Sequence, residues 1–341
     1  MAFTESTSVA TRDAFIQAVV SFAVTNAGFT DEGTSIDGAD TIYHISKGGF
    51  FWNFLEEGPF AHSGGGLTQY AVMCRISFAK ITTRASFIDD VTTTIGMEQP
   101  ARMAVYTSTG PYVKYYLYTE GTAVHCALEV YADVFTHMSF GNITKFGTWT
   151  GGEYVTTMSG TLRSFSSPFP YTTFKSSQNM FIFDGGFNTF LTTGQYDRSA
   201  YVRYVIGAAA NDKTDFARIG AFKRDSKQCK MASVGAAWPT ATTPIVNAGI
   251  YNTLIETCGS SGVNLRAPLL SIPVHFIEDA TDRWAIRGYV PYAKIVAVPN
   301  LAPGTIVEND WIVFPLTQRA GGDNVLAPIS DNWGVAYRRV A

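Results

Sequence analysis

Residues 123–137, AVHCALEVYADVFTH, alternate between apolar and more polar side chains over most of their length. The apolar positions are Val124, Cys126, Leu128, Val130, Ala132 and Val134, and between them lie His125, Glu129, Tyr131, Asp133 and His137. A period of two is typical of a strand with one buried face, because successive side chains of a strand point to opposite faces of its sheet. We therefore expect one long strand over 123–137 in a protein built mainly from strands.

Shorter segments rich in Ile, Val, Tyr and Phe lie on both sides of this stretch, separated by Gly, Asp or Pro residues, and predict strands joined by turns. We expect strands at residues 41–46, 49–55, 70–78, 103–107, 112–119, 272–277, 284–290, 294–298, 310–314 and 335–340. Lys47-Gly48-Gly49 predicts a hairpin turn, because glycine adopts positive φ angles without steric cost. Prolines between the C-terminal segments, such as Pro291, are expected at strand edges.

One segment near the N-terminus has the spacing of a helix. Between Val9 and Ala27, apolar residues recur at steps of three and four, which places them on one helical face. Thr11 is suited to cap the N-terminus, the helix dipole favours Asp13 in the first turn, and Gly28 permits a left-handed exit. We expect the helix to bury an apolar face that includes Phe15, Val19 and Phe22.

The predicted fold class is therefore α+β and β-rich, with one N-terminal amphipathic helix followed by antiparallel sheets in a sandwich-like arrangement. Prolines and serines gather at 164–170, and periodicity is weak over 226–244. These breaks predict a helix plus β-rich domain at 1–165, a loop-rich middle segment at 166–240 and a C-terminal β domain at 241–341.

Composition excludes several classes of protein. Of the 341 residues, 16% are charged and 14% aromatic, and the formal net charge is −3. Disordered chains combine low hydrophobicity with high net charge, and nucleic-acid-binding domains are usually basic, so neither class fits. No apolar run reaches the length of about 18 residues that a membrane helix needs. We expect no stable nucleic-acid binding and no membrane association.

The N-terminus and the cysteines indicate folding in a cytoplasm. Residues 1–10 lack the basic and apolar regions of a secretory signal. The spacing of the cysteines matches no metal or redox motif, and we expect four buried, reduced thiols, with two disulfides as an alternative if the fold aligns them. These residues are Cys74, Cys126, Cys229 and Cys258.

The residues that are able to carry chemistry form no recognisable site. His125, Glu129, Asp133 and His137 would share a helical face, as zinc ligands do, but four residues of a strand span about 13 Å and cannot converge on one ion. We interpret these four residues as a solvated or interface-facing polar stripe. The glycine-rich stretches lack the lysine of a phosphate loop, and no nucleophile motif occurs. We expect no catalytic residue, no metal site and no cofactor.

Two clusters are candidates for partner contacts. Phe50, Phe51, Trp52 and Phe54 are four large rings within five residues, which cannot all face one side of a strand. A second layer must cover them, supplied by this chain or by a neighbouring subunit.

The second cluster is a basic run. Positive charge gathers at Arg218, Lys223, Arg224, Lys227 and Lys230, relieved only by Asp225. The run suits a solvated loop, and Lys223, Arg224 and Lys227 are also candidates for contact with an acidic partner or a passing nucleic acid.

Three stretches resemble virion structural proteins of tailed bacteriophages. The first is Asp13-Ala14-Phe15-Ile16 with Ala27-Gly28-Phe29-Thr30, where Ala27 separates Asn26 from Gly28 and Phe29 stands where tryptophan is commoner. The second is His137-Met138-Ser139-Phe140-Gly141-Asn142-Ile143, then Phe146-Gly147 and Thr150-Gly151-Gly152-Glu153-Tyr154. The third is Trp311-Ile312-Val313-Phe314-Pro315, then Asn332-Trp333-Gly334-Val335-Ala336-Tyr337-Arg338-Arg339.

The resemblance implies a non-enzymatic assembly protein that forms a ring or collar in the phage tail or baseplate. The implied partners are further copies of the chain, as a homo-oligomer, and other tail proteins. The implied location is the virion, after assembly in the host cytoplasm. Few charges and many aromatic rings suit surfaces that subunits bury between them.

Two other functions stay open. A carbohydrate-binding receptor or decoration module would stack sugars on aromatic rings, with Trp149, Tyr154, Trp238 or Trp284 as candidates. A polysaccharide hydrolase would need two carboxyl groups about 5 to 9.5 Å apart. The candidate carboxylates are Glu56-Glu57, Asp89-Asp90 and Glu278-Asp279 with Asp282.

Overall fold

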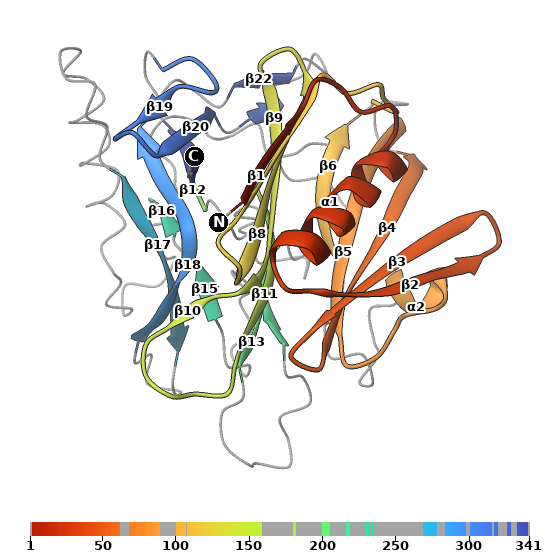
Figure 1. Ribbon diagram of the computed structural model, residues 1–341, viewed down its shortest axis with the longest axis horizontal. Coiled ribbons are helices and arrows are strands. Elements are labelled where there is room, and N and C mark those ends of the chain that lie inside the picture. Colours follow the sequence, from red (N-terminus) through yellow and green to blue (C-terminus); the bar gives the residue numbers. More distant parts are fainter. Residues whose placement is uncertain are drawn as a thin grey trace.

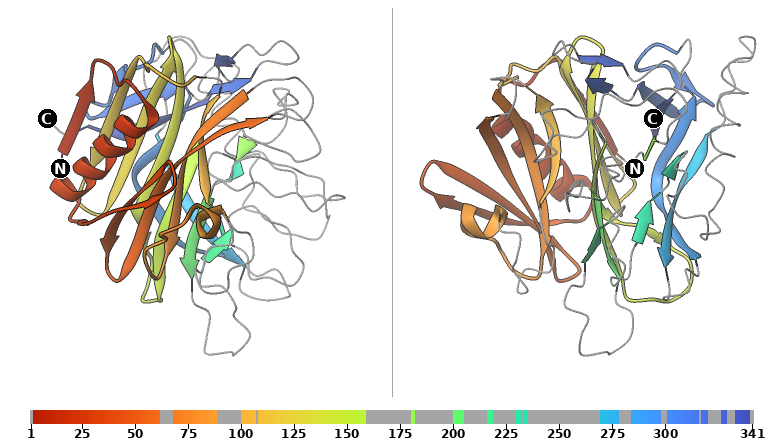
Figure 2. Two further views of the ribbon diagram at one scale, coloured as in Figure 1. Left: turned by 90° about the vertical axis from the view of Figure 1, so that its right-hand side faces the viewer. Right: turned by 180° about the vertical axis from the view of Figure 1, so that it is seen from behind.

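Three antiparallel sheets stack face to face in the computed structural model (Figure 1; Figure 2, right). We call them the N-terminal, central and C-terminal sheets. The structure describes residues 2–61, 68–88, 100–106, 108–158, 180–181, 200–204, 216–218, 229–231, 233–234, 269–277, 284–297, 301–315, 317–319, 326–328 and 333–339. The expected β-rich character is confirmed, and so is the antiparallel pairing.

The N-terminal sheet has five strands in the order β2-β3-β4-β5-β6. They are β2 (Thr30–Asp37), β3 (Asp40–Lys47), β4 (Phe50–Ala61), β5 (Thr68–Ser77) and β6 (Ala101–Tyr106). The expected turn joins β3 to β4, where Gly48 and Gly49 both have positive φ angles and Lys47 pairs with Phe50. The hairpin of β2 and β3 projects from the side of the molecule (Figure 1).

The central sheet has seven strands in the order β1-β7-β8-β9-β11-β13-β14. They are β1 (Ala2–Ser6), β7 (Lys114–Thr119), β8 (Ala123–Tyr131), β9 (Val134–Asn142), β11 (Gly151–Met158), β13 (Ala200–Tyr204) and β14 (Phe216–Arg218). Both of its faces are covered, one by the N-terminal sheet and helix α1 and the other by the C-terminal sheet (Figure 2).

The C-terminal sheet also has seven strands, six of them in the order β15-β17-β18-β23-β20-β19, while β10 pairs with β18. They are β10 (Thr144–Lys145), β15 (Cys229–Met231), β17 (Leu270–Ile277), β18 (Trp284–Ala297), β19 (Ile306–Val307), β20 (Trp311–Pro315) and β23 (Trp333–Arg338). Two small hairpins add β12 (Met180–Phe181) with β16 (Ser233–Val234), and β21 (Thr317–Arg319) with β22 (Leu326–Pro328).

Helix α1 (Arg12–Asn26) forms where the sequence predicts it. The Thr11 side chain accepts a hydrogen bond from the Ala14 amide at 3.1 Å, which satisfies one free donor of the first turn. Gly28 has a φ of 67°, the left-handed exit expected of a glycine there. Lys47 Nζ donates to the Ala27 carbonyl at 2.5 Å and to the Gly121 carbonyl at 2.6 Å. This cation therefore ties the helix C-terminus to both adjacent sheets.

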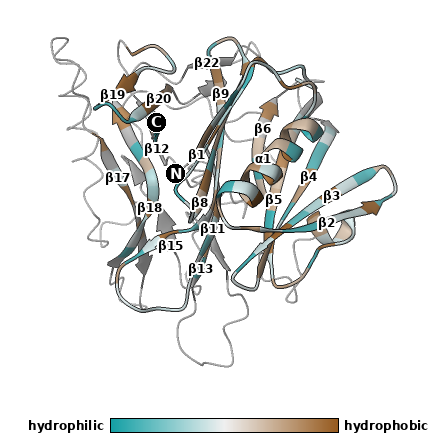
Figure 3. Ribbon diagram, viewed as in Figure 1, coloured by the Kyte–Doolittle hydropathy of each residue, from teal (hydrophilic) through white to brown (hydrophobic). Residues whose placement is uncertain are grey.

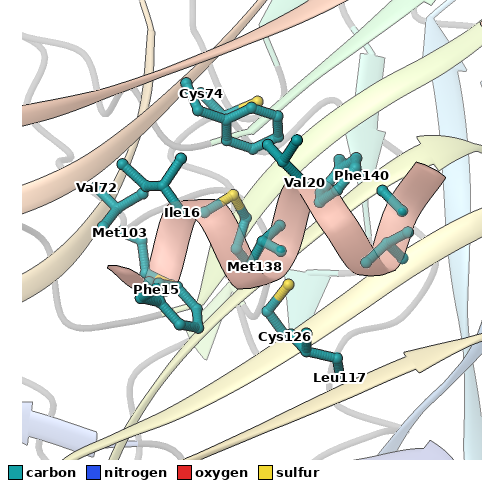
Figure 4. Packing of buried hydrophobic residues seen from close by; sticks show 14 of the residues in the cluster. Phe15, Ile16, Val20, Val72, Cys74, Met103, Leu117, Cys126, Met138 and Phe140 are labelled. Carbon is teal, nitrogen blue, oxygen red and sulfur yellow. The ribbon is translucent and has the colours of Figure 1, made fainter. Parts of the chain in front are cut away.

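The main hydrophobic core lies between α1, the N-terminal sheet and the central sheet. Figure 4 shows Phe15, Ile16 and Val20 of α1 packed among side chains of β5 and β9, including Met138 and Phe140. Hydrophobic residues recur along the strands of all three sheets (Figure 3). A smaller core covers the outer face of the N-terminal sheet beneath a second helix, α2 (Arg84–Ile88), which the sequence did not predict.

The single strand expected over 123–137 is wrong, because the chain reverses at Ala132 and Asp133. Asp133 has a φ of 62°, a left-handed conformation that aspartate tolerates better than most residues. Its amide donates to the Glu129 carboxylate at 3.0 Å, which steadies the turn. Residues 123–137 therefore form the hairpin β8–β9, and the reversal brings His137 back beside β8.

Pro291 does not end a strand as expected, because β18 runs through it. The pairing of β17 with β18 shifts register between Ser271 and Pro273, opposite the segment that contains Pro291, and Tyr292 has a φ of 56°. A bulge accommodates the proline, which lacks the amide that a regular ladder needs.

The described strands cross both predicted domain boundaries. Strands β13 and β14, from the predicted middle segment, complete the central sheet, and β15 from that segment pairs with β17 of the C-terminal sheet. Strand β10, from the predicted N-terminal domain, pairs with β18. The divisions at 165 and 240 therefore do not separate independent sheets in the described part of the chain.

Candidate functional site

A cluster of polar side chains is buried between the central and C-terminal sheets. His125 on β8, His137 and Ser139 on β9, and Tyr154 on β11 have no solvent exposure. Their backbones lie on adjacent strands, with His125 paired to Ser139 and Ala127 to His137. We call these residues, together with Tyr118 on β7 and Tyr337 on β23, the interlayer cluster.

Hydrogen bonds and ring stacking connect the interlayer cluster. His125 Nδ1 bonds to Ser139 Oγ, and Ser139 Oγ lies 3.1 Å from the Tyr154 hydroxyl. The Tyr337 ring stacks on His125 with centroids 5.1 Å apart, and its hydroxyl lies 3.3 Å from His137 Nδ1. Tyr337 therefore joins the C-terminal sheet to both histidines.

Burial disfavours the charged forms of His125, Tyr154 and Tyr337 in the interlayer cluster. Desolvation lowers the pKa of His125 from 6.5 to about 3, because an imidazolium there would lose its hydration. Desolvation likewise raises the pKa of Tyr154 and Tyr337 above the ordinary tyrosine value. At neutral pH these groups are hydrogen-bonding partners and not ions.

The Ser139–His125 pair has the components of a nucleophile and its base. Neither side chain is exposed, however, and the rings of Tyr337 and Tyr154 close the space around them. A substrate has no access to Ser139 in this arrangement. The geometry instead supports a role in holding two sheets in a fixed relative position, because each buried polar group constrains its partners.

The four residues weighed as metal ligands do not converge. His125 and His137 lie in the interlayer cluster, while Asp133 forms the hairpin turn that Glu129 steadies. Within the described ranges, no group of three or more His, Cys, Asp and Glu side chains is arranged to hold a metal ion. The interpretation as a solvated stripe is wrong for both histidines, which are fully buried.

A second polar cluster surrounds the start of α1. The Tyr43 hydroxyl donates to Asp13 Oδ1 at 2.6 Å, and Gln17 Nε2 donates to Asp13 Oδ2 at 2.6 Å. Arg12 forms an ion pair of 2.7 Å with Glu56. Burial raises the pKa of Tyr43 to about 12, and its hydrogen bond to Asp13 contributes in the same direction. These contacts join the first helical turn to strands β3 and β4.

The Glu56-Glu57 pair does not form a hydrolytic dyad. Successive side chains of β4 point to opposite faces, and each carboxylate has its own arginine, Arg12 for Glu56 and Arg102 for Glu57 at 2.6 Å. The other candidate carboxylates, Asp89-Asp90, Glu278-Asp279 and Asp282, lie outside the described residues.

The four rings expected to need a covering layer find it within this chain. Trp52 and Phe54 have no exposure and belong to the main core, and Phe50 packs against that core and beneath the Arg203 guanidinium, 4.1 Å from its ring centroid. Phe51 is half-buried on the other face of β4. Contact with a partner stays a prediction for these residues, and Trp52 and Phe54 offer no surface to one.

The residues predicted to stack on sugars or to contact an acidic partner lie in different surroundings. Tyr154 is fully buried, and Trp149 donates its indole N–H to the Arg287 carbonyl at 3.1 Å while Lys145 Nζ lies over its ring. Tyr154 therefore offers no face to a sugar, whereas Trp149 is half-buried and sugar binding by it stays a prediction. The other residues lie outside those whose side chains the structure describes: Lys223, Arg224, Lys227, Trp238 and Trp284.

Sequence analysis missed an outward-facing edge strand, β2. Among the described strands β2 pairs only with β3, so one side of its backbone faces outward. Ile36 on this strand is 68% exposed, more than any other large hydrophobic residue in the described part of the chain. The strand is polar, TDEGTSID, and lacks the alternation that reveals a half-buried strand.

No family model matches this chain, and no curated protein matches it. Within the described residues, no helix is long and apolar enough to span a membrane.

Proposed function

We propose that this chain is a non-enzymatic structural protein of a tailed-phage virion, and that copies of it form a ring or collar in the tail or baseplate. The resemblance of three stretches to phage virion proteins supports this proposal. Two of those stretches meet in space, since β9 and β11 contribute His137 and Tyr154 to the interlayer cluster that Tyr337 of β23 completes. Under this proposal, the stacked sheets form a sandwich-like scaffold that positions subunit contacts.

Strand β2 is the observation that carries the proposal. An outward-facing strand edge presents unpaired amides and carbonyls to which a strand of another protein adds by backbone hydrogen bonds. The β2–β3 hairpin projects from the body, which leaves room for a neighbouring subunit (Figure 1). The exposed Ile36 supplies an apolar contact next to that edge.

The aromatic content of the chain supports the proposal less than its sequence suggests. The central sheet is covered on both faces, and the largest fully buried side chains include Trp52, Tyr112, Tyr118, Tyr154 and Tyr337. Many of the aromatic rings are therefore buried within one molecule and offer no surface to a second subunit. The proposal rests on the exposed edge and on the resemblance.

The decisive experiment measures the oligomeric state of the purified chain by size-exclusion chromatography with light scattering. We expect a discrete closed oligomer, alone or with another phage tail protein, and we expect Ile36→Lys to shift it toward monomer. Val113→Lys is the matched control, since Val113 is 43% exposed and lies outside the β2–β3 hairpin. A protein that stays monomeric at high concentration and is absent from virion mass spectra contradicts the proposal.

A further inference from the structure

His125 lies at the contact between two layers with an incomplete set of hydrogen bonds. The residue is fully buried, and its ring is stacked on Tyr337 of the C-terminal sheet. Nδ1 bonds to Ser139, Nε2 has no hydrogen-bond partner, and a backbone group of Pro291 lies close to the imidazole. Pro291 lies in the bulged part of β18, so the C-terminal sheet supplies both the stacked ring and this backbone group.

The side chains packed around His125 come from every neighbouring strand of the contact. Tyr118 of β7, Ser139 and His137 of β9, Tyr154 of β11 and Tyr337 of β23 face it, and the Cys126 thiol lies on the opposite face of β8. No carboxylate of the described residues shares a hydrogen bond with His125.

Among the described residues, charged groups beside the same contact include Glu120 and Arg338, and Glu5 and Arg339 near Tyr118. Glu120 lies 3.4 Å from the Arg338 guanidinium, which also contacts Asp310, and Glu120 bonds to the Tyr292 hydroxyl. The glutamate therefore has its own partners and is not aimed at the imidazole. A proton on His125 would create a buried cation with no counter-ion among the residues that the structure describes, and the least costly relief is to let water reach it.

We propose that protonation of His125 releases the C-terminal sheet from the central sheet, so that the contact between these layers is an acid-sensitive latch. The latch opens on the His125 side of the central sheet because the imidazole faces the C-terminal sheet. The other face of the central sheet packs on α1 and the N-terminal sheet mainly through apolar side chains, which do not titrate in the acidic range. The Glu153 carboxylate on that side is paired with Arg203, whose guanidinium lies over Phe50.

His44 provides a built-in comparison. It is fully buried on the outer face of the N-terminal sheet, and its two ring nitrogens bond to Asn53 at 2.7 Å and to Ser35 at 2.9 Å. It lies away from the contact with the C-terminal sheet, and desolvation is the main cause that lowers its pKa, as it is for His125. Protonation of His44 would therefore disturb the N-terminal sheet and not the contact between the central and C-terminal sheets.

Hydrogen exchange of the intact protein, read by mass spectrometry between pH 7 and pH 4, tests the proposal. After correction for intrinsic exchange rates, we expect the opening constant of amides in β23 and β20 to rise about tenfold per pH unit below about 6.5. We expect amides of β4 and β5 to stay protected over the pH range in which amides of β23 lose their protection. Simultaneous loss of protection in all these strands overturns the proposal, because it indicates ordinary acid unfolding.

Two variants separate the latch from general acid sensitivity. In His125→Gln the tenfold dependence of β23 opening disappears, because glutamine keeps a hydrogen-bonding group and has no titratable proton. His44→Gln keeps that dependence. An unchanged slope in His125→Gln refutes the proposal. If His125→Gln does not fold, the native chain still tests the proposal, because β23 must lose amide protection at a higher pH than β4 and β5.

Discussion

The indole N–H of Trp52 donates a hydrogen bond of 3.1 Å to the backbone carbonyl of Tyr154. Trp52 lies on β4 of the N-terminal sheet and Tyr154 on β11 of the central sheet, so one polar contact crosses the main core. The Trp52 ring also packs edge-on against Phe29, with centroids 5.2 Å apart. A ring that the sequence suggested for a partner contact thus joins two layers of one molecule.

Replacement of Trp52 tests this connection. Trp52→Phe removes the buried hydrogen bond and leaves unfilled volume, and we expect it to lower the free energy of unfolding by about 2–4 kcal/mol. Urea denaturation measures the loss. Phe51→Leu on the same strand is the control, and we expect it to cost under about 1 kcal/mol because Phe51 is half-exposed. Equal effects would show that Trp52 does not join the layers.

Lys47 holds the end of α1. Its ammonium donates to Ala27 and Gly121, and the half-buried position lowers its pKa through desolvation. Lys47→Met keeps the aliphatic stem, removes both bonds and is expected to cost about 1–2 kcal/mol in urea denaturation. Lys80→Met removes a more exposed ion pair with Glu32 and should cost less than about 1 kcal/mol. The opposite ranking would count against the role assigned to Lys47.

Gly141 of β9 allows this strand to approach the start of β8 closely. It has a φ of 126°, and a Cβ atom there would lie 2.5 Å from the Thr122 carbonyl oxygen and 2.7 Å from Ala123 Cα. These neighbours are backbone atoms that cannot rotate away. We expect Gly141→Ala to destabilise the chain by about 3 kcal/mol or more, measured by thermal or urea unfolding.

Gly121→Ala is the matched control for that substitution. Gly121 has a φ of 89°, but its Cβ position is open. Only backbone strain is added, and a cost of about 1–2 kcal/mol is expected. If both variants lose a similar free energy of unfolding, the effect at Gly141 comes from its positive φ angle and not from the clash of the added Cβ with the backbone.

The Asp13 carboxylate lies in the first turn of α1, where the helix dipole favours an anion, and it accepts a hydrogen bond from the Tyr43 hydroxyl. Burial, and then the hydrogen bond to Asp13, raises the pKa of Tyr43 to about 12. Asp13→Asn removes the anion from the first turn, so we expect a loss of about 1 kcal/mol and a fall in the pKa of Tyr43. Carbon NMR of labelled tyrosine reports that pKa directly. Gln17→Leu, which keeps the carboxylate, should not lower it.

Acid should destabilise the whole protein through His125. Its folded-state pKa of about 3 lies below the unfolded value of 6.5, so between these pH values the unfolded chain binds the extra proton. The contribution is complete above pH 6.5 and is lost as pH falls, by about 1.4 kcal/mol per pH unit. Urea denaturation at pH 7 and pH 5 measures the slope, which should be shallower in His125→Gln. A wild-type slope of zero over this range would contradict the assignment.

The missed turn at Asp133 shows why local periodicity was misleading. Ala132 and Asp133 form the reversal, and the register shift between Glu129 and Tyr131 adds a bulge. Val130 and Val134 are an even number of residues apart, so their apolar alternation continues through the turn. No glycine marks the left-handed position, because Asp133 occupies it. A short turn with a bulge therefore has the same pattern as an uninterrupted strand.

The missed edge strand has a different cause. Strand β2 has little apolar surface to bury because it lies at the outside of its sheet, so its sequence lacks periodicity. Its conformation comes from pairing with β3, which is a non-local contact. The candidate surface for assembly was therefore absent from the sequence-based predictions.

The sequence by itself determined the elements whose causes lie within a few residues: helix α1 from its apolar spacing and the Thr11 cap, and the β3–β4 turn from Gly48 and Gly49. Only the tertiary structure decided which faces meet. It placed His125 and His137 around Tyr337, a residue about 200 positions away from His137, with Tyr337 bonded to His137. Capping and turn formation depend on short-range sterics and hydrogen bonds, whereas the stacking of sheets depends on burial summed over residues distant in the chain.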